Sequence, residues 1–153
     1  MIDVKWPSFR RNQSEAVNAN ILIVEDEMLV ALEVEAILSD LGHRVVGIAP
    51  DVESAMALSH APIDLALVDL NLRDGLTGPE IGRRLCEQHG VAVLFVTANP
   101  RILGDGIAGA IGVLTKPADE ASVRAAVDYA LRVRAGDKRA TPPSALTLFQ
   151  KAA

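Results

Sequence analysis

Residues 64–69 read DLALVD, so four apolar residues lie between two aspartates. A short apolar run without polar alternation is typical of a strand that is buried on both faces. Similar runs occur at residues 21–24 (ILIV), 91–96 (VAVLFV) and 111–114 (IGVL). Strands of this kind belong to parallel sheets covered by helices, so the stretch predicts an α/β fold.

The segments between these runs carry helical signals. Residues 28–40 have apolar side chains near a 3.6-residue spacing, and similar segments occupy residues 79–89 and 119–135. Asp51 can cap a helix that ends near residue 60, and residues 99–108 form a weaker candidate because glycines interrupt them. With residues 44–49 as a further strand, five strands alternate with five helices, which predicts a doubly wound, five-stranded parallel sheet.

Composition limits the functional classes. Half of the 153 residues are hydrophobic, and the net charge is −5 with a sequence pI of about 5.1. An acidic chain without a basic patch is a poor candidate for binding nucleic acid. Cys86 is the only cysteine, and no apolar run approaches the roughly 18 residues that span a bilayer. We therefore expect a soluble, cytoplasmic protein that binds no membrane and no nucleic acid.

The apolar pattern is confined to the middle of the chain. We expect residues 1–19 to be an N-terminal tail with a short helix near residues 7–17, and residues 20–135 to be one domain. Residues 136–153 turn polar and then proline-rich, which predicts a C-terminal tail with a small apolar cluster near its end.

Polar residues follow four of the five strands. Glu25 and Asp26 follow the first strand, Asp69 the third, Thr97 the fourth and Lys116 the fifth. Ligand sites in such sheets lie beyond the carboxyl ends of the strands. Carboxylates brought together repel one another unless a cation is present, and Mg²⁺ prefers such hard oxygen ligands. Phosphoryl transfer to an aspartate uses a metal, an ammonium and a hydroxyl in this way.

Each of these residues also has an ordinary structural explanation. A single aspartate after a strand is commonly a turn residue, and acids at a helix start complement the helix dipole. Thr97 can be a capping residue and Lys116 an exposed charge. Their joint occurrence at four strand ends favours the phosphoryl-transfer interpretation.

The motifs resemble the receiver domain of bacterial two-component response regulators. The matching pieces are ILIVEDE at 21–27, DLALVDLNL at 64–72, VLFVTAN at 93–99 and GVLTKP at 112–117. The resemblance covers residues 20–135 and implies a flavodoxin-like sheet with strand order 2-1-3-4-5. It also implies a stand-alone, single-domain regulator, because the rest of the chain has no room for an output domain.

The resemblance assigns roles to single residues. Glu25 and Asp26 match the acidic pair that organises Mg²⁺, Asp69 matches the phosphoacceptor, and Asn71 matches the position whose carbonyl binds the metal.

Two further positions match the phosphate-binding part of the family's site. Thr97 matches the hydroxyl that moves toward the phosphoryl group, and Lys116 matches the phosphate-binding lysine. The bond between Lys116 and Pro117 is predicted to be cis, as in many relatives.

Two positions depart from the family pattern. Val113 stands where relatives have an aromatic residue whose ring turns inward when the threonine moves. A valine has no such ring, so we expect the coupling from Thr97 to the outer face to differ. Arg73 lies close to the site in the loop after Asp69, and we expect it to be solvated. We further hypothesise that phosphorylation reorganises the glycine-rich residues 99–110.

Other functions remain open on the sequence. A haloacid-dehalogenase-type phosphatase needs a second acid two residues after the nucleophile, and Asn71 stands there. A flavodoxin or dinucleotide-binding protein needs a phosphate-cradling loop after the first strand, where residues 25–27 are all acidic. A degenerate receiver that serves only as a scaffold is favoured by Val113 alone.

The resemblance implies partners and no enzymatic turnover of a separate substrate. The phosphoryl donor would be a histidine kinase or a histidine phosphotransfer protein, and the output a contact with an unknown target protein. The only reactions would be self-catalysed phosphorylation and dephosphorylation. A homodimer through the face of the fourth and fifth helices is left open.

Overall fold

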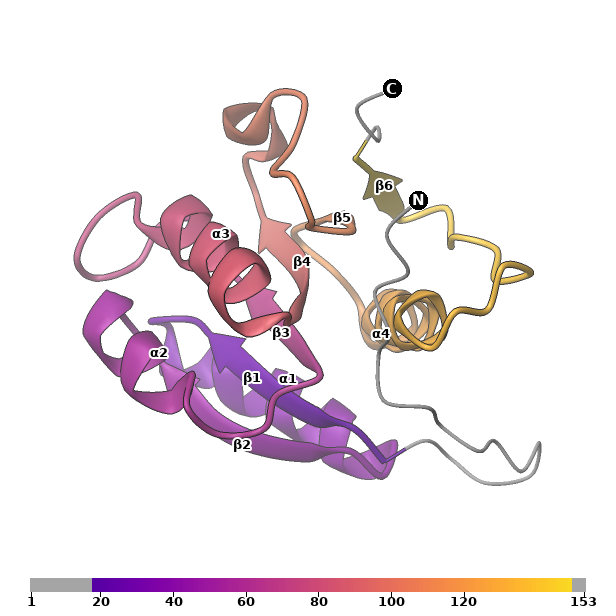
Figure 1. Ribbon diagram of the computed structural model, residues 1–153, viewed down its shortest axis with the longest axis horizontal. Helices are drawn as coiled ribbons and strands as arrows, with labels where there is room; N and C mark the ends of the chain where they lie inside the picture. Colours follow the sequence, from indigo (N-terminus) through magenta and orange to yellow (C-terminus); the bar gives the residue numbers. More distant parts are fainter. Residues whose placement is uncertain (1–17, 150–153) are drawn as a thin grey trace.

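The computed structural model describes residues 18–149, so the expected helix near residues 7–17 lies outside the described part. Five parallel strands lie in the order β2-β1-β3-β4-β5, as the family resemblance implies. These strands are β1 (Asn20–Val24), β2 (Arg44–Ala49), β3 (Leu65–Val68), β4 (Ala92–Thr97) and β5 (Gly112–Thr115). Figure 1 shows how the helices are arranged around them.

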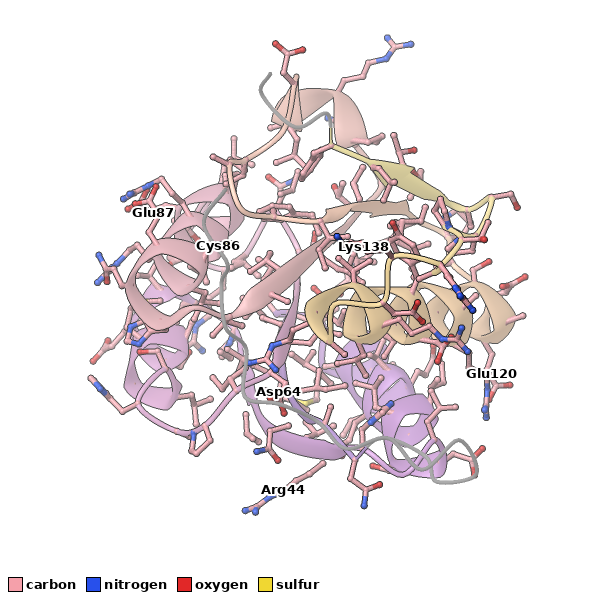
Figure 2. All side chains as sticks on the ribbon, turned by 45° about the vertical axis from the view of Figure 1, so that its right-hand side comes forward. Arg44, Asp64, Cys86, Glu87, Glu120 and Lys138 are labelled. Carbon is pink, nitrogen blue, oxygen red and sulfur yellow. The ribbon has the colours of Figure 1, made fainter. Side chains whose placement is uncertain are left out.

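Helices cover both faces of the sheet. They are α1 (Met28–Asp40), α2 (Val52–Leu58), α3 (Gly78–His89) and α4 (Glu120–Arg134). One apolar cluster joins α1 and α4 to the sheet, and a second joins α2 and α3 to its opposite face. Charged side chains such as Arg44, Glu87 and Glu120 project outward from this body (Figure 2). The doubly wound fold is thereby confirmed.

Alternation along the strands sorts side chains between the two clusters. In β3, Leu65 and Leu67 join the α1/α4 cluster, whereas Ala66 and Val68 join the α2/α3 cluster. The other central strands alternate in the same way because successive side chains point to opposite faces. The strands are therefore buried on both sides, which explains their continuous apolar runs.

Local signals explain several element boundaries. Asp51 caps α2 through a 2.9 Å hydrogen bond from the Ser54 backbone N–H, and Asp119 caps α4 through a 2.7 Å bond from that of Ser122. Gly90 ends α3 in a left-handed conformation with φ of 63°. These caps satisfy backbone groups that a helix leaves unpaired at its ends.

Two segments differ from the sequence prediction. The helix expected at residues 99–108 is only a 3₁₀ turn, η1 (Pro100–Leu103), because Gly104, Gly106 and Gly109 adopt positive φ values that interrupt a helix. The segment expected as a C-terminal tail contributes a sixth strand, β6 (Leu146–Leu148), antiparallel to β5. Among residues 18–149, no helix is both long and apolar enough to cross a membrane.

Candidate functional site: a lysine-bridged acidic cluster

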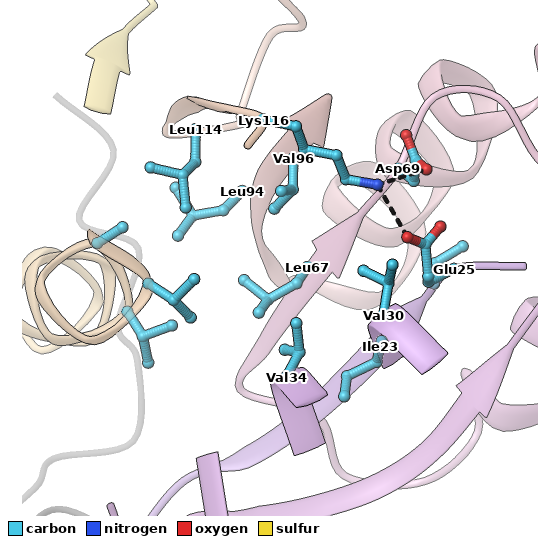
Figure 3. A pocket seen from close by; sticks show the side chains of 14 residues that line it. Ile23, Glu25, Val30, Val34, Leu67, Asp69, Leu94, Val96, Leu114 and Lys116 are labelled. Carbon is cyan, nitrogen blue, oxygen red and sulfur yellow. Dashed lines mark hydrogen bonds and ion pairs between the residues drawn. The ribbon is translucent and has the colours of Figure 1, made fainter. Parts of the chain in front are cut away.

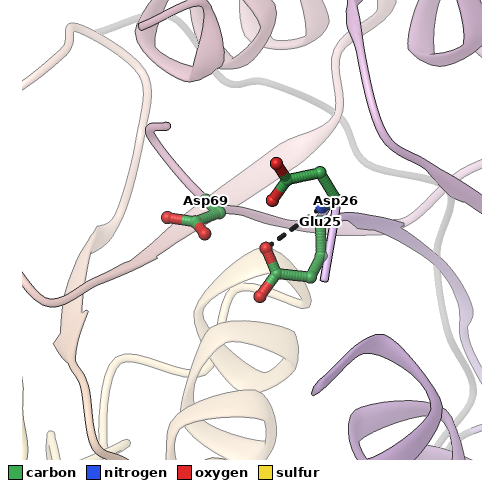
Figure 4. Close-up of side chains that lie close together, drawn as sticks. All are labelled: Glu25, Asp26 and Asp69. Carbon is green, nitrogen blue, oxygen red and sulfur yellow. Dashed lines mark hydrogen bonds between the residues drawn. The ribbon is translucent and has the colours of Figure 1, made fainter. Parts of the chain in front are cut away.

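Three carboxylates meet at the carboxyl ends of β1 and β3. One carboxylate oxygen each from Glu25, Asp26 and Asp69 lies within 4.8 Å of the other two (Figure 4). Alternation places Glu25 and Asp69 on the α1/α4 face, because they continue the series of Ile23 and Leu67. The pairing of β1 with β3 therefore brings two residues 44 positions apart in sequence into one site.

Lys116 joins two of these acids from the end of β5. Its Nζ lies 2.8 Å from Glu25 Oε1 and 3.0 Å from Asp69 Oδ2, and it donates a hydrogen bond to each (Figure 3). The preceding residue on the same face, Leu114, lies in the α1/α4 cluster, so the strand geometry directs Lys116 to the acids. The peptide bond between Lys116 and Pro117 is cis, as predicted.

Burial shifts the protonation equilibria of this cluster. Glu25 is only 5% exposed, and burial together with a hydrogen bond to Asp69 raises its pKa to about 7 despite Lys116. Burial disfavours the charged form of Lys116, but the hydrogen bonds that its ammonium donates to Glu25 and Asp69 outweigh this effect and raise the pKa of the lysine. The cluster places three carboxylates beside the ammonium of Lys116, and this surplus of acids favours a further cation.

The donor set fits a magnesium ion. Glu25, Asp26 and Asp69 supply carboxylate oxygens, and at least Asp26 is exposed, which leaves room for metal-bound water. This is the one group of three or more metal-ligating side chains in the part of the chain that the structure describes. Receiver domains generally bind Mg²⁺ at such an acidic pocket.

The backbone around Asp69 is held closely. Its N–H donates to the Val24 carbonyl at 2.9 Å, and its Oδ1 accepts a 2.7 Å bond from the Leu70 N–H. Gly78, at the start of α3, donates its N–H to the Leu70 carbonyl at 3.0 Å. A Cβ on Gly78 would overlap the Asp69 carbonyl and lie 2.5 Å from Leu70 Cα. The sequence alone did not place Gly78 at the site. The signal that could have indicated it is a glycine directly before the proline at a helix start.

Thr97 reaches the same end of the sheet from the opposite face. Its side chain is 1% exposed and continues the series of Val93 and Phe95, which belong to the α2/α3 cluster. Its Oγ1 accepts a 3.0 Å hydrogen bond from the Asn99 N–H. The hydroxyl is thus linked to the chain that follows β4.

The loop after Asp69 contains a tight turn. Asn71 is exposed, and Leu72 and Gly75 bond to each other's backbone across a tight turn. Arg73 is 65% exposed at its side chain, in line with the expectation, but its Nε donates a 2.7 Å hydrogen bond to Asp51 Oδ2. This ion pair ties the loop to the start of α2.

An apolar cavity of about 40 Å³ lies beneath the cluster, between the sheet, α1 and α4. Val30, Val34 and Leu67 line it, and Lys116 crosses one end (Figure 3). Because its lower wall is apolar, the cavity offers no further ligands to a metal.

The model of response regulator receiver domains matches residues 21–128 of the chain. The chain belongs to this receiver domain family. The match spans every element from β1 to most of α4 and includes the acidic cluster, Thr97 and Lys116. The family resemblance read from the motifs is therefore confirmed.

Relatives of the receiver domain include larger regulators. The phyllosphere-induced regulator PhyR of Methylorubrum extorquens is 36% identical over 115 residues, which cover 72% of this chain and 43% of that protein. ArcA, the aerobic respiration control protein of Escherichia coli, is 36% identical over 102 residues, covering 64% of this chain and 42% of ArcA. The chain thus spans about two fifths of the length of these curated relatives.

Solved structures support the same assignment. The solution structure of the PhyR receiver domain of Erythrobacter litoralis superimposes with a TM-score of 0.68 at 33% identity, covering 74% of this chain and 90% of that one. The anti-anti-sigma factor PhyR of Bartonella quintana gives a TM-score of 0.61 at 30% identity, covering 80% of this chain and 49% of that one.

Proposed function

We propose that Asp69 accepts a phosphoryl group in a Mg²⁺-dependent reaction. The observation that carries this proposal is the position of Lys116, whose ammonium lies between Glu25 and Asp69 within the cluster of three acids. A carboxylate nucleophile, an ammonium beside it and a metal-binding acid pair are the groups that phosphoryl transfer to an aspartate requires.

Glu25, Asp26 and Asp69 would hold the metal, together with the backbone carbonyl of Asn71. When bound, Mg²⁺ neutralises negative charge on the phosphoryl oxygens. Without a metal, the acids would only complement the helix dipole at the start of α1. That role does not account for the burial of Glu25.

The reaction forms one bond and breaks one bond. A carboxylate oxygen of Asp69 bonds to phosphorus while the bond from phosphorus to the donor nitrogen of a phosphohistidine breaks, and its electron pair stays on the imidazole. Lys116 already donates to Asp69 Oδ2, so a small shift lets it donate to a phosphoryl oxygen. The Thr97 hydroxyl would donate to another phosphoryl oxygen.

The phosphoryl donor would be a histidine kinase or a histidine phosphotransfer protein in the cytoplasm. The output would be a contact with a downstream protein, since the net charge of −5 does not favour nucleic acid. The chain would turn over no separate substrate, since Asn71 replaces the second acid of a phosphatase. A homodimer through the last helix, which exposes Val133, is an alternative output.

Incubation with acetyl phosphate and Mg²⁺, followed by intact mass spectrometry, tests the proposal. We expect the wild type to gain the mass of one phosphoryl group and Asp69→Asn to gain none. Asp128→Asn is a matched control, because Asp128 is an exposed aspartate on α4, outside the acidic cluster.

Chelation of Mg²⁺ should also prevent the mass gain. An unmodified wild type, or a phosphoryl group retained in Asp69→Asn, would contradict the assignment. Hydrolysis of a generic phosphoester with turnover would instead support a phosphatase.

A further inference from the structure

The β5 edge of the sheet carries β6. Gly112, Val113 and Leu114 pair with Leu148, Thr147 and Leu146 in antiparallel register. The Phe149 N–H continues this ladder with a 3.2 Å bond to the carbonyl of Ile111. Leu146 is buried, so β6 contributes to the core as well as to the edge (its position beyond β5 is visible in Figure 1).

Phe149 seats the strand in the α2/α3 cluster. Its ring centroid lies 6.1 Å from that of Phe95, a distance typical of aromatic pairs. A Cβ on Gly106 would lie 2.5 Å from Phe149 Cδ1, and a Cβ on Gly112 would overlap the Thr147 carbonyl. Any other residue at Gly106 or Gly112 would therefore obstruct the strand.

The seat of Phe149 is connected to the candidate phosphorylation site. Phe95 and Thr97 lie on the same face of β4, two residues apart. The Asn99 N–H bonds to Thr97 Oγ1, and residues 99–106 then lead through η1 to the glycine under the ring. Thr97 is thus connected to both surfaces that the ring contacts, through β4 to Phe95 and through residues 99–106 to Gly106.

We infer that β6 is a detachable strand whose docking against β5 is weakened when Asp69 is phosphorylated. This inference rests on the proposed function. When the Thr97 side chain moves to donate to a phosphoryl oxygen, its Oγ1 leaves the Asn99 N–H, η1 and Gly106 shift, and the seat of Phe149 is lost. The β5 edge then becomes free to pair with an extended segment of a target.

The small size and partial exposure of β6 allow it to detach from β5. β6 has three residues, and Thr147 and Leu148 are exposed. A short strand with few buried side chains opens at a small free-energy cost compared with global unfolding. Changes of docking at such a strand need only a modest coupling energy.

Amide hydrogen exchange in the full chain tests the inference without any variant. Exchange at residues 146–149 is measured with Mg²⁺ alone and with Mg²⁺ and beryllium fluoride, a phosphoryl mimic that binds carboxylates. We expect exchange there to accelerate at least about fivefold, the lower end of typical allosteric couplings. Unchanged exchange in protein that has bound the mimic would overturn the inference and leave phosphorylation at Asp69 intact.

Linkage supplies a second readout. If the mimic weakens β6 docking, loss of docking must strengthen mimic binding by the same factor. Phe149→Ala should therefore bind beryllium fluoride about fivefold more tightly or better. Leu148→Ala is the matched control, because it truncates an exposed side chain of the same strand and should bind as the wild type does. Equal affinity of Phe149→Ala and the wild type for the mimic would overturn the coupling. If neither the wild type nor the two variants bind the mimic or gain phosphoryl mass, both proposals are overturned.

Discussion

The acidic end of the sheet and the connection from β4 to β5 lie beside each other but differ in packing. Around Asp69, backbone hydrogen bonds hold the chain in place, and the close approach of Gly78 leaves no room for a side chain at that position. In the connection, residues 98–111, only η1 is helical, and a Cβ on Gly104 would meet nothing within 4 Å.

This difference separates chemistry from signalling. Phosphoryl transfer needs groups that are held in place before the reaction. A conformational response needs a segment that can change its arrangement at low cost. Thr97 belongs to both regions, because it is buried at the site and bonded to Asn99 of the connection.

The largest effect is expected from Gly78→Ala, which tests how tightly the acidic end is packed. The added methyl group would overlap the Asp69 carbonyl, and the atoms that it meets in Asp69 and Leu70 are backbone atoms, which cannot rotate away. We expect the free energy of unfolding to fall by more than about 3 kcal/mol in urea denaturation. Gly90→Ala is the control, because its positive φ adds strain but no neighbour lies within 4 Å. Equal losses in both variants would contradict the close packing.

The next effect concerns the charge on Glu25 without Mg²⁺. Its folded-state pKa of about 7 exceeds the ordinary 4.5, so its stabilising contribution is complete below pH 4.5 and disappears as the pH rises through about 7. The contribution is roughly 3 kcal/mol at most. We expect Glu25→Gln to flatten the decline in unfolding free energy between pH 4.5 and 8, and the exposed Glu27→Gln to retain it. An unchanged slope in Glu25→Gln would show that other groups cause the decline.

A smaller effect is expected in the connection from Gly106→Ala. Alanine strains the backbone at φ of 103° and overlaps the Phe149 ring. We expect a loss of about 2 kcal/mol and rapid amide exchange in β6, because the ring is displaced. Gly104→Ala, which adds strain in the same segment without the overlap, should leave β6 protected. Loss of β6 protection in both variants would assign the effect to the backbone alone.

The smallest effect is expected from Ile102→Ala in η1. Its side chain is 41% exposed, so its truncation should change the unfolding free energy by about 0.5 kcal/mol or less. Leu103→Ala, at a position only 6% exposed, should cost about 2 kcal/mol or more by the same measurement. A similar loss of unfolding free energy in both variants would mean that Ile102 is also firmly packed, and that η1 does not differ from the acidic end in packing.

The sequence predicted the sheet because its strands are buried on both faces. A short, continuous apolar run such as that of β3 fits few structures other than a strand covered on both faces. The carboxyl ends of parallel strands lie together, so the polar residues that follow the strands meet at one end of the sheet. The convergence of Glu25, Asp26, Asp69 and Lys116 follows from this arrangement.

The connection and the C-terminus could not be predicted in the same way. Three residues of β6 carry too short a pattern to distinguish a strand from a tail. The seat of Phe149 depends on the space above Gly106, which only the three-dimensional arrangement reveals. The glycines in residues 99–108 predict only a weak helix, and the structure has just the 3₁₀ turn η1, because Gly104 and Gly106 adopt positive φ values.

The antiparallel strand β6 also protects the sheet against edge-to-edge aggregation. The edge of a sheet exposes unpaired N–H and C=O groups that can pair with another molecule, and β6 covers this edge along β5. β6 is itself short, and its Thr147 and Leu148 side chains are exposed. A chain shortened before Leu146 would expose the unpaired edge of β5 to solvent. We therefore expect the shortened chain to aggregate at high concentration.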